Sequence, residues 1–154
     1  MRIGLLIFAL VSSLAAGRAS GIPGGSAAQA QSAAGLESMR RKAEKAEGGD
    51  RARLYVELAQ VEVQEAGAKF TAGDADRAQA EIKDAANDAG VATQAAIGSR
   101  KRLKQTEIAI HELARRLDSI EHSLTAEDRP PVKVAVERLQ TMTTNLLQAM
   151  FKKK

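Results

Sequence analysis

The chain of 154 residues has no cysteine, no tryptophan, three prolines and only 3% aromatic residues. Without cysteine, a disulfide framework, a thiolate metal site and a cysteine nucleophile are all excluded. A core with so few rings must be built from Ala, Leu, Val and Ile. Because alternating β-branched runs are also almost absent, packed helices are favoured over a β-sandwich. The length and composition therefore predict one small all-α domain.

The first residues have the pattern of a secretory signal peptide. Arg2 precedes an apolar stretch over residues 3–16, and a small-x-small site ends at Ala19, so residues 1–19 are expected to be removed by cleavage before Ser20. The apolar stretch is shorter than the about 20 residues that span a bilayer, and an uncleaved membrane anchor is the less favoured interpretation. The protein is therefore expected to be exported, either to the periplasm or as a secreted protein.

A linker is expected between this segment and the folded domain. Residues 20–35 are mostly Gly, Ser, Ala and Gln and bury too little apolar surface to offset their chain entropy. We therefore expect a flexible linker, followed by a single helical domain over residues 36–154. In that domain apolar residues recur at spacings of three and four. Gly48, Gly73 and Asp128, which precedes two prolines, mark where its helices begin and end.

The path of the chain near Gly98 and Ser99 decides the predicted architecture. Apolar positions continue in phase from Ala75 to Leu124 across these two residues, whereas a connecting turn would normally reset the phase. The favoured prediction is one central helix over residues 75–124, about 75 Å long. Two antiparallel hairpins would share it in an elongated, coiled-coil-like rod. The alternative is a four-helix bundle in which the chain breaks at Gly98 and Ser99 and the two hairpins fold together.

The stretch AGAKFTAGDADRAQAEIKDA, residues 66–85, resembles the turn of a tetratricopeptide helical hairpin. Gly67 and Phe70 lie before this turn, and Gly73 and Asp74 lie in it. The resemblance implies a helical hairpin at this place. No second copy follows at that family's period of about 34 residues, so no repeat array is expected. The whole chain also resembles exported bacterial helical proteins of no known activity, which implies no catalytic or binding residues.

Motifs of catalytic or cofactor chemistry are missing from the sequence. It contains no nucleophile elbow, no glycine-rich phosphate loop and no HExxH zinc motif. The only histidines, His111 and His122, are expected on one polar helix face with Arg115 between them. They lack the Glu-x-x-His spacing of di-iron bundles. We therefore expect no enzymatic activity, no bound metal and no cofactor.

Cations that are separate in sequence are expected to meet in the rod. In its last antiparallel hairpin Lys152 lies beside Lys104, and the start of the second helix lies across the same junction. The predicted basic belt comprises Arg51, Arg53, Arg100, Lys101, Arg102, Lys104, Lys152, Lys153 and Lys154. Such a cluster attracts an anionic lipid, an acidic polysaccharide or an acidic protein with salt-sensitive affinity. Lysines at a helix C-terminus also simply complement the helix dipole. No aromatic platform exists for stacking bases, so nucleic acid is not an expected partner.

Three apolar residues, Val91, Ile97 and Ile108, fall on the outer face of the predicted rod. They form a candidate apolar docking surface, or they argue for the bundle instead. The favoured functional hypothesis is a non-enzymatic, exported interaction or scaffold protein of the cell envelope. It would self-associate or hold an envelope protein partner. The alternative is a peripheral binder of anionic envelope surfaces, lipid or polysaccharide, that acts through the basic belt.

Overall fold

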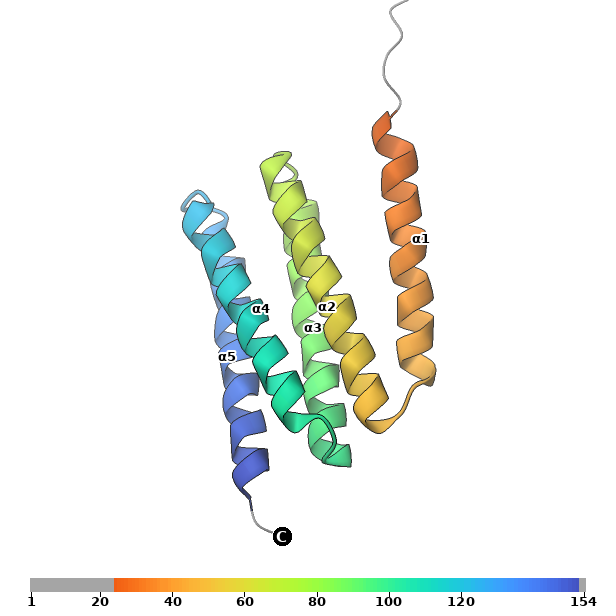
Figure 1. The fold of residues 1–154 in the computed structure, drawn as a ribbon. Helices are drawn as coiled ribbons and strands as arrows, with labels where there is room; N and C mark the ends of the chain where they lie inside the picture. Colours follow the sequence, from red (N-terminus) through yellow and green to blue (C-terminus); the bar gives the residue numbers. More distant parts are fainter. Residues whose placement is uncertain (1–23, 153–154) are drawn as a thin grey trace, which may run out of the picture.

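The computed structural model describes residues 24–152, which form five helices and no strand (Figure 1). Their bounds are α1 Gly24–Lys45, α2 Gly48–Thr71, α3 Ala75–Ser99, α4 Leu103–Ser123 and α5 Arg129–Phe151. The prediction of an all-α protein is thus confirmed. The expected signal peptide over residues 1–19 lies outside the described residues, as do Lys153 and Lys154.

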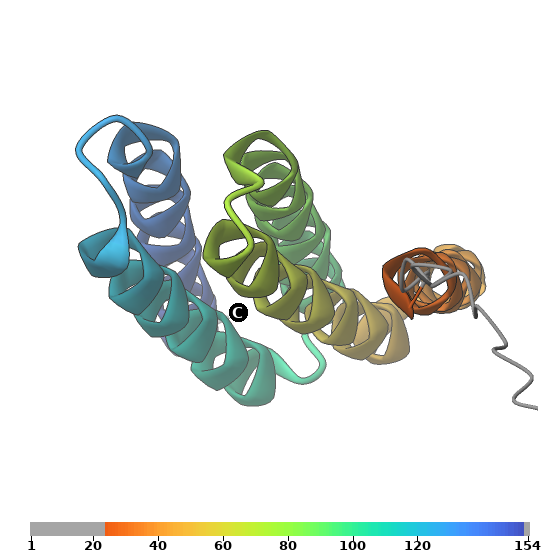
Figure 2. The ribbon, with the colours of Figure 1, turned by 90° about the horizontal axis from the view of Figure 1, so that it is seen from above.

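The helices form two antiparallel hairpins that pack side by side, as Figures 1 and 2 show. One hairpin is α2 with α3, and the other is α4 with α5. Between the hairpins α2 contacts α4 and α3 contacts α5, so four helices enclose one core. The backbone of α1 packs along the outer side of α2 alone. The α2–α3 hairpin turns at Gly73 and Asp74, where the resemblance over residues 66–85 implied a hairpin.

The favoured central helix over residues 75–124 is wrong, and the alternative four-helix bundle is observed. The chain leaves α3 after Ser99 and enters α4 at Leu103, with φ angles of 54° at Arg100 and 57° at Arg102. Each left-handed residue other than glycine costs about 1–2 kcal/mol. This cost is offset because folding the hairpins together buries apolar faces that a rod would leave in water. The apolar phase persists across the turn because both hairpins face the same core.

The beginning of α1 lies within the segment expected to be a flexible linker, residues 20–35. This helix begins at Gly24, so residues 24–35 are helical. Ala and Gln are good helix formers, and residues 27–34 contain no glycine or proline to interrupt them. The helix continues directly into Leu36 and Met39, which pack against the core.

Small residues let the two hairpins approach closely. A Cβ atom added at Gly67 of α2 would lie 3.6 Å from Ile120 of α4, and one at Gly90 of α3 would lie 3.4 Å from Met142 of α5. The buried face of α3 is also built largely of alanine. Large side chains of the neighbouring helices therefore fill the space that α3 and these glycines leave free.

Candidate functional site

Two turns of the chain contact each other at one end of the bundle. A Cβ atom added at Gly49 would lie 3.0 Å from the Cβ of Lys101, and one at Gly48 would lie 3.3 Å from the Cβ of Ser99. The carboxyl-terminal end of α5 lies at the same end (Figure 1). The α1–α2 turn, the α3–α4 turn and the end of α5 thus form one structural unit.

Arg100 holds the end of α5 to the α3–α4 turn. Its Nη2 donates to the carbonyl oxygens of Ala149 and Lys152 at 3.3 and 3.0 Å. The last carbonyl groups of a helix have no partner within the helix, so the guanidinium caps α5 and complements its dipole. Arg100 therefore has a structural role as well as a charge.

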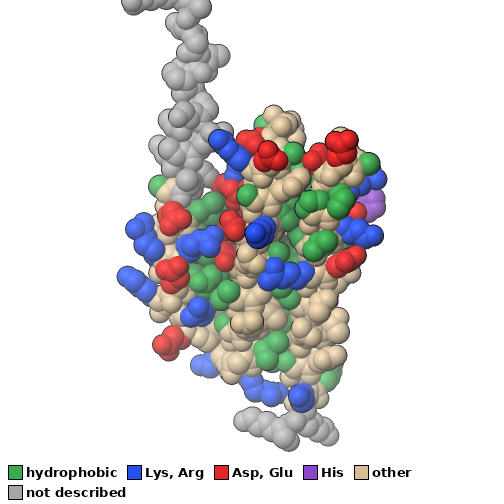
Figure 3. Space-filling model, turned by 180° about the vertical axis from the view of Figure 1, so that it is seen from behind, with side chains coloured by type: hydrophobic (Ala, Val, Ile, Leu, Met, Phe, Trp, Pro, Cys, Tyr) green, Lys and Arg blue, Asp and Glu red, His purple; other side chains and the backbone are tan. Residues whose placement is uncertain are grey.

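Most of the cations predicted to cluster do lie together, at this end of the bundle. We define the basic end as Arg51, Arg53, Arg100, Lys101, Arg102, Lys104 and Lys152. They surround an end rather than the middle of a rod, because the chain reverses at residues 100–102. In the view from behind, Lys and Arg side chains lie along the lower end of the molecule with hydrophobic side chains above them (Figure 3).

Part of this charge is engaged within the protein. Arg53 Nη1 lies 2.5 Å from Glu57 Oε1, and the guanidinium of Arg51 lies 5.5 Å from the centre of the Tyr55 ring. With Arg100 bonded to α5, three cations of the basic end have internal partners. These three are therefore less available to an external anion.

The remaining cations of the basic end are Lys101, Arg102, Lys104 and Lys152. All are exposed, and none forms an ion pair with a residue in the described part of the chain. Asp50, in the first turn of α2, offsets part of their charge. Unpaired cations from the α3–α4 turn and from both helices of the α4–α5 hairpin therefore face solvent together.

A hollow of about 210 Å³ lies at the basic end between α2 and α4. Arg53 of α2 and Arg102 of the α3–α4 turn line it, together with the polar side chains of Gln105 and Thr106. Glu57, the ion-pair partner of Arg53, lines it as well. Because Arg53 is paired with Glu57, the guanidinium group of Arg102 and its hydrogen-bonding neighbours are the part of the hollow suited to an oxyanion such as a phosphate or a sulfate.

The three apolar residues predicted to form a docking surface do not share one exposed surface. Val91 and Ile97 are partly buried against the core, whereas Ile108 is 46% exposed. The turn at residues 100–102 causes this difference, because in the bundle α3 packs against more neighbours than in a rod. Val91, Ile97 and Ile108 therefore do not form a single apolar docking surface.

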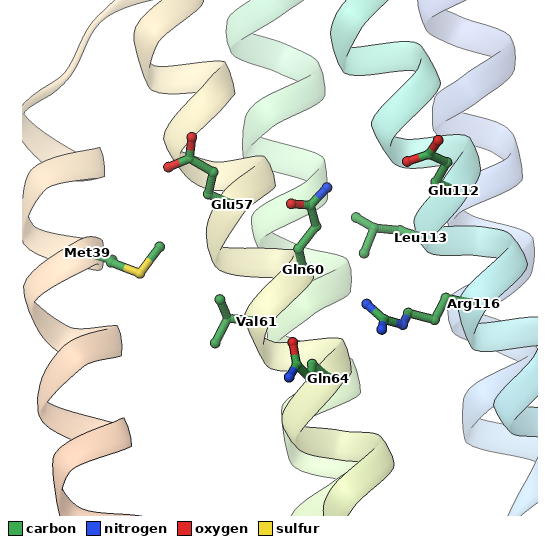
Figure 4. A pocket seen from close by; sticks show the side chains of 8 residues that line it. All are labelled: Met39, Glu57, Gln60, Val61, Gln64, Glu112, Leu113 and Arg116. Carbon is green, nitrogen blue, oxygen red and sulfur yellow. The ribbon is translucent and has the colours of Figure 1, made fainter.

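A groove of about 690 Å³ runs over α2 between α1 and α4. Figure 4 shows Met39 on α1, Leu113 and Arg116 on α4, and α2 between them. The other lining residues are Glu57, Gln60, Val61, Gln64 and Glu112. Apolar residues from three helices with charged neighbours are typical of a surface that receives a peptide or a helix.

A buried charge cluster, which the sequence analysis missed, joins α1 to the α2–α3 hairpin. The side chains of Glu62 and Asp88 are 2% and 6% exposed, and Arg40 Nη2 lies 2.6 Å from Glu62 Oε1 and 3.4 Å from Asp88 Oδ2. Burial and then the charge of Asp88 raise the pKa of Glu62 to about 8, although Arg40 acts in the opposite direction. Burial also raises the pKa of Asp88.

A proton on Glu62 completes this cluster. Glu62 Oε2 and Asp88 Oδ2 accept no hydrogen bond from any described residue. A protonated Glu62 can donate to Asp88, so that one proton serves both buried carboxyl groups. The sequence signal that could have revealed the cluster is position, because Glu62 lies four residues from both Leu58 and Ala66 on the buried face of α2.

The two histidines of α4 are exposed. His122 Nδ1 lies 2.7 Å from the carbonyl oxygen of Asp118, and this contact raises the pKa of His122. Across residues 24–152, no group of three or more His, Cys, Asp or Glu side chains is arranged to hold a metal ion.

No protein-family model matches the chain, and no curated protein and no solved structure is significantly similar to it. Within the described part of the chain, no helix combines the length and the apolar character needed to cross a bilayer. The function is therefore inferred from the placement of the residues themselves.

Proposed function

We propose that this protein is a non-enzymatic binding protein that docks on anionic surfaces of the cell envelope through its basic end. The observation that carries the proposal is the meeting of cations from three separate segments at one end of the bundle. Such a concentration of charge attracts anions over a distance and raises their local concentration. The guanidinium-lined hollow between α2 and α4 offers a place for an individual anionic group.

The backbone at Arg102 supports this proposal. Its φ of 57° is a conformation that glycine adopts freely and arginine does not. Backbone strain that persists at a residue is typical of functional positions. Arg102 forms no ion pair within the described residues, so an internal ion pair does not account for its strained backbone. The stem of Arg102 packs near Gly49 of the neighbouring turn, and its exposed charge remains available to a ligand.

The assignment to the envelope rests on the expected signal peptide over residues 1–19. The non-enzymatic character rests on the missing catalytic motifs of the sequence. Both are part of the proposal, and export is tested by finding whether the mature chain begins at Ser20.

Binding to a polyanion column tests the charge mechanism. The chain from Ser20 onward contains every described helix and is compared with the triple variant Lys101→Gln, Arg102→Gln and Lys104→Gln. We expect the variant to bind heparin at least about tenfold more weakly. Wild-type binding should disappear at 0.5 M salt, where the screening length is about 4 Å.

A second triple variant controls for net charge. It removes the same number of cations from exposed positions away from the basic end, namely Lys83→Gln, Arg115→Gln and Lys133→Gln. We expect this control to bind as the wild type does. Equal losses in the two variants would show that only the total charge matters, and unchanged binding in the first would contradict the proposal.

The groove over α2 favours a second function, which is to hold an envelope protein in the manner of a scaffold. Apolar contacts with Met39, Val61 and Leu113 would survive high salt, unlike binding at the basic end. The substitution Gln64→Arg places a long charged side chain in the groove, and Gln140→Arg on the exposed side of α5 is its control. A partner retained at 0.5 M salt and lost only with Gln64→Arg would establish the scaffold function.

A further inference from the structure

We infer that the anionic surface is a lipid bilayer, and that Leu147 and Phe151 of α5 insert into it while the neighbouring cations bind its headgroups. This inference rests on the proposed function and adds the chemical class of the ligand. It follows from where the exposed hydrophobic side chains lie.

The described part of the chain has four exposed large hydrophobic residues, and three of them lie near the basic end. They are Ile108, Leu147 and Phe151, with exposures of 46%, 39% and 81%. Leu147 and Phe151 are four residues apart, so they lie on one face of α5 within about 6 Å along its axis. Ile108 belongs to the second turn of α4, the antiparallel neighbour of α5 that begins at this end. We call these three residues the apolar tip.

Unpaired cations border the apolar tip. Lys152 follows Phe151 directly, and Lys104 lies one helical turn before Ile108. Lys101 and Arg102 come from the adjoining α3–α4 turn. Apolar side chains surrounded by Lys and Arg are the chemistry of a peripheral membrane site, because the former enter the acyl boundary and the latter pair with acidic headgroups.

The apolar tip favours a lipid over a polysaccharide as the ligand of the basic end. A hydrated, acidic polysaccharide could pair with the cations, but it offers no apolar environment to the aliphatic side chains of Leu147 and Ile108. A bilayer removes Leu147 and the ring of Phe151, which share one face of α5, from water at the same time. Charge and apolar exposure at the same end therefore fit an anionic bilayer.

The fourth exposed hydrophobic residue provides a matched control. Val134 is 64% exposed but lies near the start of α5, at the opposite end from the apolar tip. It lines a shallow groove of about 430 Å³ between α3 and α5. A serine at this position removes exposed apolar surface without touching the apolar tip.

The substitution Phe151→Trp gives a direct reading of insertion. The chain has no tryptophan of its own, so all tryptophan emission comes from this one position. The chain from Ser20 is used, because the apolar residues 3–16 could bind a bilayer by themselves. On vesicles of phosphatidylcholine mixed with phosphatidylglycerol we expect the emission to shift to shorter wavelength, and on phosphatidylcholine alone we expect no shift.

Loss of the Leu147 and Phe151 side chains should weaken binding to the bilayer without unfolding the protein, because both side chains are exposed. We expect the double variant Leu147→Ser and Phe151→Ser to bind the phosphatidylglycerol vesicles at least about tenfold more weakly. Its circular dichroism melt should match that of the wild type. Val134→Ser should bind the vesicles unchanged.

Each other outcome has a definite meaning. Vesicle binding with no emission shift and no effect of the serine variants would overturn insertion and leave the proposed function in place. Binding to heparin but not to the vesicles would overturn the lipid assignment alone. Binding to neither, or equal binding to vesicles with and without phosphatidylglycerol, would overturn the proposed function and this inference together.

Discussion

The substitution Glu62→Gln is expected to stabilise the protein at alkaline pH. The pKa of Glu62 is raised from 4.5 to about 8, first by burial and then by Asp88, with smaller contributions from Asp84 and Glu81, against the lowering effect of Arg40. A raised pKa means that the folded chain holds the proton more tightly than the unfolded chain. The resulting stability is complete below pH 4.5 and is lost as the pH rises through about 8.

The size of the effect follows from the two pKa values. At about 1.4 kcal/mol for each pKa unit, the rise from 4.5 to about 8 corresponds to on the order of 5 kcal/mol. This is an upper value, because the ionisations of the neighbouring Glu62 and Asp88 carboxyl groups depend on each other. The glutamine amide keeps the shape of the neutral carboxyl group and can accept the hydrogen bond from Arg40, but it does not ionise. Near pH 9 we expect the variant to be about 2–5 kcal/mol more stable than the wild type, and near pH 5 about equally stable.

Urea unfolding followed by far-ultraviolet circular dichroism measures this difference. The wild type and Glu62→Gln are compared near pH 5 and near pH 9, with Glu112→Gln as a control because Glu112 is exposed on α4. The control should differ from the wild type by the same small amount at both pH values. A difference between wild type and Glu62→Gln that does not change with pH, or a variant that is less stable near pH 9, would refute a protonated Glu62.

Three further substitutions test the turns and the core. Arg102→Gly removes the backbone strain of a left-handed arginine, so it should raise the free energy of unfolding by about 1 kcal/mol. It should also weaken polyanion binding. A loss of stability would show that the arginine side chain holds the turn. Gly49→Ala places a Cβ atom 3.0 Å from that of Lys101 and should cost about 1–3 kcal/mol in urea unfolding, whereas no cost would mean that the two turns separate easily. Ile110→Asp introduces a charge at a fully buried position and should unfold the α4–α5 hairpin, and an unchanged circular dichroism melt would contradict the packing described for α4.

Local signals in the sequence were sufficient for the helices and hairpins, but not for the long-range fold. Gly73 and Asp74 predicted the first hairpin turn, and Asp128 before two prolines predicted the start of α5. The favoured prediction missed the turn at residues 100–102 because arginine has no preference for a left-handed backbone, whereas the alternative placed a break directly before it, at Gly98 and Ser99. Apolar periodicity shows that a helix face is buried, but it does not show whether the partner is one hairpin or two.

The basic end was predictable because its cations flank junctions that both architectures share. Lys104 near the start of α4 and Lys152 after the end of α5 lie at the same end of this hairpin in the rod and in the bundle alike. The buried cluster of Arg40, Glu62 and Asp88 was not predictable in the same way, because charged residues on amphipathic helices usually face solvent. Only the folded arrangement shows that α1 carries the cation for two carboxyl groups of other helices.

Because the α1–α2 turn packs on the α3–α4 turn, ligand binding at the basic end is thermodynamically linked to the docking of the two hairpins. Arg53 belongs to one hairpin and Lys104 to the other, so both lie at a common surface only while the hairpins are docked. An anionic surface that contacts both binds the docked form more tightly than an opened one, and mass action then shifts the equilibrium further toward docking. The ligand would therefore slow hydrogen exchange at the distant α2–α4 interface, including buried Leu113, although it touches only the end of the bundle.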